Sequence, residues 1–599
     1  MDISWSKNFR ISLRTKNFHP KYPVLIGEVV GRVWDRDKKV WTIPISSVEL
    51  LARKLLREGI WSERDVETVR NAISKILDFH NTDISLVEKN INLPLRPYQR
   101  ESLMFFKNRG SALGALDMAL GKSFLALAYL FDLRQSGKVD KALILVPVSA
   151  TWHWYREAKK FFSDKLKLCV IGYSVDEKGK IKKLSKEDRI KQLKSKEYDG
   201  YLLNYEKLKD IVDMVPEVVN DKPTNRTKSI IQLKEWDKPN KFLVIGDEIT
   251  RIKSWSAKRT KLMKALPATY RIGLSGRPIE NNITELYTIL DWIWPGCLGS
   301  WGKFQERFGT TNKFGKITSV KDQNTLKEIV DYIAIKFSRY EVLKDLPPII
   351  RNQYDIEFTD QEERDYALIS NKIEDAITLL GQADSRTGMI NVLALLQFSR
   401  MYCDHPILLR LSESKTAKSL NITSGHSSKF EEFKIILDEI LNLREKVVVF
   451  SQFRRMIELI EADIIKKYHF IKVYKMVGGL SSLKKQQLID DFTKDPNPAV
   501  FLATDTGAYA IELQCASYII NYDIHWNPAV LEQRISRLHR PGQQKPVNVI
   551  NLVVSGPDMV EQHVLDVVKK KNQLYKDIMG DETGEQPNNM ATNEAGELP

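Results

Sequence analysis

Two short apolar runs restrict the fold of this chain more than any other feature. They are ALILV at 142–146 and LVIGD at 243–247. Strands that are buried on both faces of a parallel sheet have this nearly continuous apolar composition. A third segment, ALDMALGKSFLALAYL at 115–130, passes from a loop into an apolar helix. Together the three segments predict an α/β fold built on parallel sheets.

The start of that apolar helix predicts a phosphate-binding loop. Backbone N–H groups and the Lys122 ammonium at Gly121-Lys122-Ser123 are expected to surround nucleotide phosphates, with the Ser123 hydroxyl on Mg²⁺. The motif is incomplete, because Leu116 stands where the first glycine is expected. Alone, these three residues are weak evidence for a nucleotide site.

An acidic strand end strengthens this interpretation. The segment FLVIGDE at 242–248 closes with two carboxylates. We expect Asp247 to hold Mg²⁺ and Glu248 to act as the base that polarises the attacking water. An ordinary acidic turn at the end of the strand is the alternative. The two acids occur together with Lys122 at a domain-sized separation in the sequence, which favours a shared nucleotide site.

Two arginines near the C-terminus suggest a second half of the site. In QRISRLHRPGQ at 533–543, Arg537 and Arg540 stand three positions apart. On a helix they would share one face and could point at one phosphate. An arginine supplied by a second domain would make hydrolysis depend on domain closure. An exposed basic helix face near a turn is the alternative.

Length, charge and cysteine usage limit the class of protein. A chain of 599 residues should contain three or four domains. The net charge of +15 favours a polyanionic partner without separating DNA from RNA. No apolar run of about 18 residues is present, and the four cysteines form no CxxC pair. We therefore expect a soluble intracellular protein without a membrane partner, a zinc site or disulfides.

Eleven ordered motifs resemble the Swi/Snf-type, superfamily-two DNA-dependent ATPases, a family that includes chromatin remodellers and fork-remodelling translocases. The resemblance covers roughly residues 91–575. The motifs are LRPYQ (95–99), DMALGKS (117–123), VPVSATWHW (146–154), LLNYEKL (202–208), DEITRIKS (247–254), LSGRPIENNITELYTILDWIWP (274–295), LKDLPP (343–348), FSRMYCDHPILL (398–409), VVVFSQF (447–453), ATDTGAYAIELQCASYIINYDIHWNP (503–528) and QRISRLHRPGQ.

The resemblance implies roles for residues in both lobes. ATP and Mg²⁺ would be held and cleaved in the first lobe by Gln99, which reads adenine, and by Gly121, Lys122, Ser123, Asp247 and Glu248. The second lobe would complete the site with Gln533, Arg537 and Arg540. Nucleic-acid contact or coupling between the lobes would involve Ser149, Asn204, Tyr205, Ser275, Gly276, Thr504, Asp505 and Gly507.

Three positions depart from the family pattern. Ala119 replaces a phosphate-loop glycine, which is tolerated at an ordinary φ and costs affinity at a positive φ. Thr250 stands where most members have a histidine, which puts coupling between the lobes in doubt. Glu512 would repel a nearby phosphate unless it faces away or makes a structural bond. Because every residue needed for hydrolysis is present, we favour an active ATPase.

The expected architecture has two RecA-like parallel-sheet lobes with helical insertions and a small α+β N-terminal domain. The boundaries are 1–90 (accessory domain), 91–280 (first lobe), 281–427 (helical protrusions and brace), 428–570 (second lobe) and 571–599 (helix end and acidic tail). In the accessory domain, 29–44 predicts a β-hairpin, and 46–59 a helix with Glu49 in a capping box. Trp34 and Trp41 either stack on DNA bases or pack on their own helix.

These features predict a monomeric, ATP-dependent translocase on double-stranded or branched DNA that does not separate strands. Backbone contacts are expected from Lys207, Lys209, Lys253 and the basic stretch 178–194. DNA-bound proteins or RNA polymerase are further candidate partners. The alternatives are an ATPase that recycles RNA polymerase and a nucleotide-gated DNA-binding scaffold that has lost hydrolysis. A prokaryotic or viral setting would place the protein in the cytoplasm or nucleoid, and a eukaryotic one in the nucleus.

Overall fold

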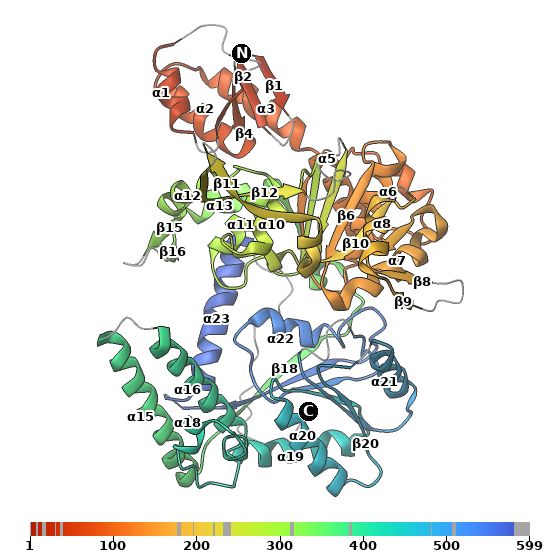
Figure 1. Cartoon of the computed structure of the whole chain (residues 1–599), viewed down its shortest axis with the longest axis vertical. Coiled ribbons are helices and arrows are strands. Elements are labelled where there is room, and N and C mark those ends of the chain that lie inside the picture. The colour runs from red at the N-terminus through yellow and green to blue at the C-terminus, as the bar shows by residue number, and fades with distance from the viewer. Residues whose placement is uncertain are drawn as a thin grey trace. The chain divides into compact units, whose positions relative to one another are not determined.

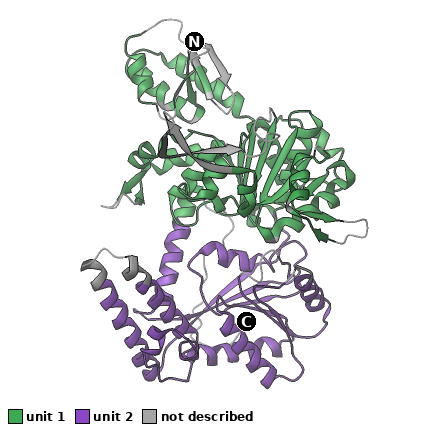
Figure 2. Cartoon of the chain, viewed as in Figure 1, with its two compact units in different colours: residues 1–342, 574–582 green, residues 343–573, 583–599 purple. Residues whose placement is uncertain are grey.

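The computed structural model divides the chain into two compact units (Figure 2). Unit 1 comprises residues 1–342 and 574–582, and unit 2 comprises residues 343–573 and 583–599. The structure describes residues 2–6, 10–14, 19–29, 32–35, 40–175, 181–195, 197–219, 222–231, 241–311, 317–382, 386–480, 482–505, 511–556 and 558–579.

Unit 1 begins with a four-stranded antiparallel sheet in the order β1-β2-β4-β3 (Figure 1). The predicted hairpin is confirmed, because β3 pairs with β4 and Trp34 lies opposite Trp41. The elements are β1 (Asp2–Ser6), β2 (Arg10–Arg14), α1 (Tyr22–Gly27), β3 (Val33–Asp35), β4 (Val40–Pro44), α2 (Val48–Arg57), α3 (Glu63–Leu77) and α4 (Ser85–Glu88).

The helix that follows the hairpin is amphipathic, as predicted, and buries Leu51 and Leu55. Its predicted capping box is wrong. The N-cap residue is Ser47, which makes no side-chain cap bond. Glu49 instead binds Arg70 of α3, with 2.5 Å between the carboxylate and the guanidinium. A charged partner on a neighbouring helix therefore outcompetes the local backbone for this side chain.

The core of unit 1 is a seven-stranded sheet in the order β17-β5-β14-β13-β6-β10-β7, in which every pairing is parallel. Both predicted apolar runs are central strands of this sheet, β6 and β13. The strands are β5 (Ala112–Leu116), β6 (Lys141–Val146), β7 (Leu168–Val170), β10 (Gly200–Asn204), β13 (Phe242–Gly246), β14 (Tyr270–Ser275) and β17 (Ala334–Phe337).

Helices cover this sheet, and three two-stranded ribbons extend from it (Figure 1). The helices are α5 (Pro97–Arg109), α6 (Lys122–Gln135), α7 (Thr151–Phe162), α8 (Lys186–Lys194), α10 (Lys258–Lys264), α11 (Ile283–Ile293), α12 (Trp301–Phe308), α13 (Gln323–Ile333) and α14 (Arg339–Val342). The ribbon strands are β8 (Tyr173–Val175), β9 (Ile181–Lys183), β11 (Val212–Val219), β12 (Lys222–Ile231), β15 (Gly309–Thr311) and β16 (Ile317–Val320).

The N-terminal residues are part of the unit 1 core. Ile43, Val48 and Leu51 belong to the same buried cluster as Leu326 and Val330 of α13. The expected accessory domain therefore shares its apolar surface with the first lobe.

Unit 2 contains a second parallel sheet, in the order β18-β23-β22-β19-β21-β20. Its strands are β18 (Ile349–Ile356), β19 (Val447–Phe450), β20 (Lys472–Met476), β21 (Ala499–Ala503), β22 (Tyr518–Asn521) and β23 (Val547–Val554). Its helices are α15 (Asp360–Gln382), α16 (Arg386–Asp404), α17 (Ile407–Arg410), α18 (Lys415–Lys418), α19 (Ser428–Asn442), α20 (Arg454–Lys467), α21 (Ser482–Lys494), α22 (Pro528–Ile535) and the beginning of α23 (Val560–Met579).

The prediction of two parallel-sheet lobes with helical insertions is confirmed. The segment 281–427 holds helices, as expected, but it also supplies β17 to the first sheet and β18 to the second. Among the described helices, none has both the length and the apolar composition to cross a membrane.

Candidate nucleotide site and nucleic-acid contacts

The loop between β5 and α6 has the backbone of a phosphate-binding loop. Gly121 has φ +76° and precedes Lys122, the first residue of α6. The Lys122 ammonium donates to the carbonyls of Leu116 at 2.9 Å and Asp117 at 3.1 Å. Phosphate oxygens could take the place of these two carbonyl oxygens, at the N-terminus of a helix that favours negative charge.

The structure shows whether the backbone at Ala119 has an ordinary or a positive φ. Its φ is +67°, in the left-handed region. A Cβ atom there costs roughly 1–2 kcal/mol, which a glycine would not incur. The substitution therefore places strain in the phosphate loop.

Gln99 supports this loop from α5. Its Oε1 accepts the Arg96 backbone N–H at 3.0 Å, and its Nε2 donates to the Leu120 carbonyl at 3.4 Å. A Cβ atom on Gly121 would lie 2.9 Å from that Nε2, and the φ of +76° at this position also favours glycine. Adenine recognition by Gln99 stays a prediction.

The acidic strand end after β13 is held by three contacts. Trp154 Nε1 donates to Asp247 Oδ2 at 2.8 Å, and the Glu248 backbone N–H donates to Asp247 Oδ1 at 3.0 Å. The Tyr205 hydroxyl donates to the Asp247 carbonyl at 2.8 Å. Glu248 itself has φ +48°, a strained backbone that is characteristic of functional turns.

The electrostatics of Asp247 tie it to the phosphate loop. Burial raises the pKa of this carboxyl, while the Trp154 hydrogen bond and the Lys122 positive charge oppose the rise. A magnesium ion would favour the charged form further, and oxygen ligands such as the Asp247 carboxylate and the Ser123 hydroxyl are those that Mg²⁺ prefers. The residues present therefore fit a bound metal–nucleotide complex.

The loop after β14 meets the phosphate loop directly. A Cβ atom on Gly276 would lie 3.5 Å from the Leu116 carbonyl and 3.8 Å from Lys122 Nζ. Since β14 lies between β5 and β13, the loops after these three parallel strands share one edge of the sheet. The structure thus brings Lys122, Asp247 and the predicted coupling loop together.

The predicted nucleic-acid residues of unit 1 differ in exposure. Asn204 is buried and donates to Thr151 Oγ1 at 2.9 Å, and Tyr205 is buried beneath Asp247. Lys253 pairs with Glu280 at 2.5 Å, whereas Lys209 is exposed. Ser149 lies in a short 3-10 turn after β6. Their contact with DNA stays a prediction.

The arginine segment of unit 2 corrects one expectation. Helix α22 ends at Ile535, so Arg537 and Arg540 lie in the turns beyond it and do not share a helix face. Pro541 disfavours helical backbone at Arg540 only, so it does not account for the end of the helix at Ile535. Arg540 pairs with Glu512, with 3.0 Å between Nη1 and Oε1. Glu512 therefore makes the structural bond that was one of its two alternatives.

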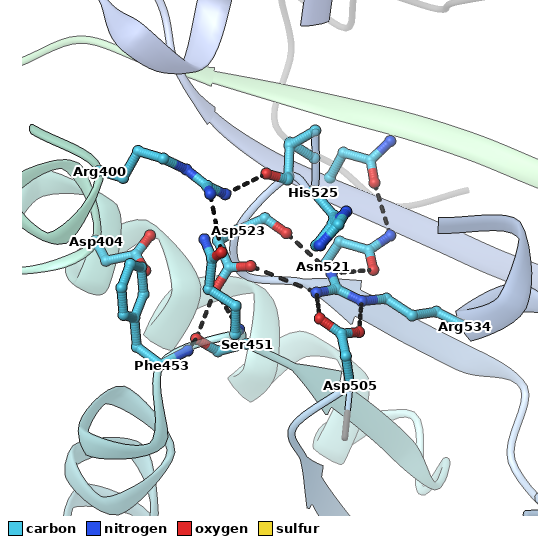
Figure 3. A network of polar contacts seen from close by, with 12 residues as sticks. Arg400, Asp404, Ser451, Phe453, Asp505, Asn521, Asp523, His525 and Arg534 are labelled. Atoms are coloured by element: carbon cyan, nitrogen blue, oxygen red, sulfur yellow. Dashed lines mark hydrogen bonds and ion pairs between the residues drawn. The ribbon is translucent and has the colours of Figure 1, made fainter. Parts of the chain in front are cut away.

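The last turn of α22 carries an arginine that sequence reasoning missed. Arg534 is 2% exposed and donates two hydrogen bonds to the Asp505 carboxylate, at 2.7 and 2.9 Å (Figure 3). It also donates to Asn521 Oδ1 at 3.0 Å and to the Asp523 carbonyl at 2.9 Å. Asp523 in turn accepts the Ser451 hydroxyl at 2.5 Å.

This network joins the ends of three neighbouring strands. Ser451, Asp505 and Asp523 follow β19, β21 and β22 by one or two residues. A polar residue just after each of three buried strands was the available sequence signal. Burial raises the pKa of Asp505, but the charge and hydrogen bonds of Arg534 outweigh it and hold the pKa below its usual value.

Of the remaining predicted residues of unit 2, the structure describes Thr504 and Gln533. Thr504 is buried and its backbone N–H donates to the Met476 carbonyl at 3.2 Å. Gln533 lies on α22 beside Arg534. Gly507 lies outside the described residues.

Together, the two RecA-like sheets, the phosphate loop and the acidic strand end define a helicase-like, nucleotide-dependent protein. The SNF2-related domain matches residues 98–408, and the helicase conserved C-terminal domain matches residues 431–542. The chain belongs to the SNF2-related family.

Known relatives extend well beyond this chain. YwqA of Bacillus subtilis is 25% identical over 86% of this chain, and TATA-binding protein-associated factor mot1 of Aspergillus fumigatus is 24% identical over 93%. The chain spans 52% and 31% of the lengths of these two proteins. The SWI2/SNF2 ATPase core of Sulfolobus solfataricus, solved in complex with dsDNA, is 25% identical with a TM-score of 0.37, over 82% of this chain and 94% of that one.

Proposed function

We propose that this protein hydrolyses ATP to move along double-stranded DNA, and that it remodels protein–DNA complexes or branched DNA without processive strand separation. The observation that carries the proposal is the meeting of the phosphate loop, Asp247 and the Gly276 loop at one edge of the unit 1 sheet. Membership of the SNF2-related family supports it.

The binding half of the reaction belongs to unit 1. Lys122 would exchange its two carbonyl contacts for phosphate oxygens, and Ser123 and Asp247 would hold Mg²⁺. The bound metal would neutralise charge on the triphosphate. Trp154 keeps the Asp247 carboxylate oriented, so the metal ligand needs little rearrangement.

The hydrolytic half needs a base and a cation. Glu248 would accept a proton from water as the water oxygen bonds to the γ-phosphorus and the bond to the β–γ bridging oxygen breaks, which yields ADP and phosphate. Arg537 and Arg540 of unit 2 would stabilise the charge that develops on the transferring group. Gly276, against the phosphate loop, would transmit the nucleotide state.

Movement on DNA would use contacts with the phosphate backbone, which do not depend on sequence. The exposed Lys209 and the basic helix α8 are candidate contacts in unit 1. DNA-bound proteins, RNA polymerase among them, are the proposed targets of the movement.

Two observations favour a second function, a nucleotide-gated DNA-binding scaffold without hydrolysis. Ala119 is strained in the phosphate loop, and Arg540 is already paired with Glu512. Both features would lower turnover and leave nucleotide binding possible.

One assay separates the two functions. ATP turnover is measured without nucleic acid and with single-stranded, duplex and forked DNA, in the wild type, in Glu248→Gln and in the surface control Glu206→Gln. A translocase shows turnover that duplex DNA stimulates and that only Glu248→Gln removes. Turnover that no DNA changes, and that Glu248→Gln leaves intact, would sink the proposal.

A further inference from the structure

Unit 1 contains a pocket whose lining includes no residue of the phosphate loop. Its volume is about 350 Å³. The residues that line it come from the turn before α10, the beginning of α11, helix α12 and strand β16, and Figure 1 labels these elements. The side chains that line it are Lys253, Ser254, Trp255, Asn282, Thr284, Glu285, Thr288, Trp301 and Ile317. None of them has a role in the nucleotide chemistry proposed above.

Two tryptophans form parallel walls of this pocket. The Trp255 and Trp301 rings are inclined by only 12°, with 6.5 Å between centroids. Trp255 is 53% exposed, so the two nearly parallel rings offer aromatic surface on which a planar ring can stack.

The two walls differ in burial and in the number of aromatic contacts. Trp301 is held from behind by Tyr287, at 5.1 Å between centroids, and by Phe304, at 5.8 Å. Trp255 is 53% exposed and lies in a turn between η5 (Ile249–Ile252) and α10. A packed ring beside an exposed one suits a ligand that reaches the site from solvent and stacks.

The charge around Trp255 selects the ligand. Residues 249–266 contain six lysines and arginines, four of which pair with carboxylates of other segments. Lys258 and Lys261 are exposed and form no ion pair within the described part of the chain. Such a surface repels a cationic side chain and attracts a ring that is joined to a phosphate.

The pocket also offers polar partners for a base edge. Asn282 uses its Oδ1 to cap α11, where the Thr284 backbone N–H donates to it at 2.9 Å, and its Nδ2 has no partner among the described residues. Lys253 Nζ, from another lining residue, pairs with Glu280 at 2.5 Å and lies 3.6 Å from Glu285. An amide donor such as Asn282 Nδ2 matches the carbonyl and ring-nitrogen acceptors of a nucleobase.

We infer that the Trp255–Trp301 pocket binds an unpaired base of DNA. Bases inside a duplex are stacked on their neighbours, whereas those of single-stranded or branched DNA can insert between aromatic rings. The inference rests on the proposed DNA function and adds to it a preference for DNA with unpaired nucleotides. A free mononucleotide shares the same chemistry and is the alternative source of the ring.

The test measures the binding of labelled DNA to the full chain. Fluorescence anisotropy follows an oligothymidylate of about 20 nucleotides, longer than one binding site, and a blunt duplex of the same length. The variants are Trp255→Ala, Trp255→Phe and the control Phe470→Ala, which changes an exposed aromatic side chain of unit 2. Thermal unfolding confirms that each variant is folded.

We expect Trp255→Ala to weaken single-strand binding about tenfold to a hundredfold, since one base stack is lost. Trp255→Phe should recover most of the affinity, and duplex binding and duplex-stimulated turnover should stay within about twofold. Thymidine monophosphate is tested as an unlabelled competitor. Unchanged single-strand affinity in Trp255→Ala would overturn the inference, as would an effect of this variant on competition by thymidine monophosphate alone. If duplex DNA did not stimulate ATP turnover of the wild type, that result would instead refute the proposed function.

Discussion

Ala119 holds a backbone conformation that suits glycine, and the phosphate loop should improve when glycine is restored. Ala119→Gly removes strain at φ +67° and should raise the free energy of unfolding of unit 1 by up to about 1 kcal/mol. Nucleotide affinity should rise with it. Urea unfolding and titration with a fluorescent ATP analogue measure the two effects.

The matched control is Ala126→Gly, in the interior of α6. That change should lower the free energy of unfolding by about 1 kcal/mol, because glycine is a poor helix former. If both variants were destabilised alike, the strain at Ala119 would not be real.

Glu512 competes with phosphate for Arg540. The 3.0 Å ion pair neutralises a guanidinium that the proposed reaction needs. Glu512→Gln should therefore raise DNA-stimulated turnover severalfold, measured as kcat in a coupled ATPase assay. Asp438→Asn, which breaks the exposed pair with Lys467 in the same unit, should leave kcat unchanged. A lower kcat in Glu512→Gln would show that this carboxylate is needed to position Arg540.

At the scale of elements, the protonation of His405 makes the stability of helix α17 depend on pH. Its Nδ1 accepts the Ile407 backbone N–H at 3.2 Å, at the beginning of that helix. Burial lowers the pKa of His405 to about 4, although the Glu362 charge opposes the shift. The unfolded chain binds the proton at about pH 6.5 and the folded chain only near pH 4. The stability that neutral His405 contributes is therefore fully present above pH 6.5 and is lost as pH falls toward 4.

His405→Asn should flatten this dependence, because an asparagine oxygen can accept the same N–H without titrating. The measurement is the free energy of unfolding of unit 2 in urea between pH 4 and 7. His469→Asn, which changes an exposed histidine of the same unit, should keep the wild-type slope. An identical slope in both variants would exclude His405 as the source.

The helices and strands also differ in how far the sequence predicts them. Buried strands are recognisable from local composition, so β6, β13 and the beginning of α6 were predicted correctly. Contacts that depend on the order of strands in the sheet were not predicted from the sequence. The partners of Arg534 come from loops after β21 and β22, which are separated in the sheet by β19. Neither that order nor the Trp154 bond to Asp247 follows from periodicity.

The whole molecule divides the proposed reaction between its two compact units. Lys122, Asp247 and Glu248 lie in unit 1, and Arg537 and Arg540 lie in unit 2. The chain passes between the units after residue 342 and again within α23, whose Tyr575 ring lies under the Arg277 guanidinium at 4.6 Å. Arg277 directly follows Gly276, so α23 contacts the loop that would transmit the nucleotide state.

Binding and hydrolysis should therefore be separable by mutation. Arg537→Ala should lower DNA-stimulated turnover by about a thousandfold or more, because a charge that stabilises the transition state is lost. Nucleotide affinity, which Lys122 and the phosphate loop provide, should change by less than about threefold. Arg454→Ala, which breaks an exposed pair on α20, is the control. Arg537 is buried, so Arg537→Lys provides a variant that keeps the charge. Equal losses of affinity and turnover in a folded Arg537→Ala protein would place its role in folding or binding, and full turnover would remove it from the reaction.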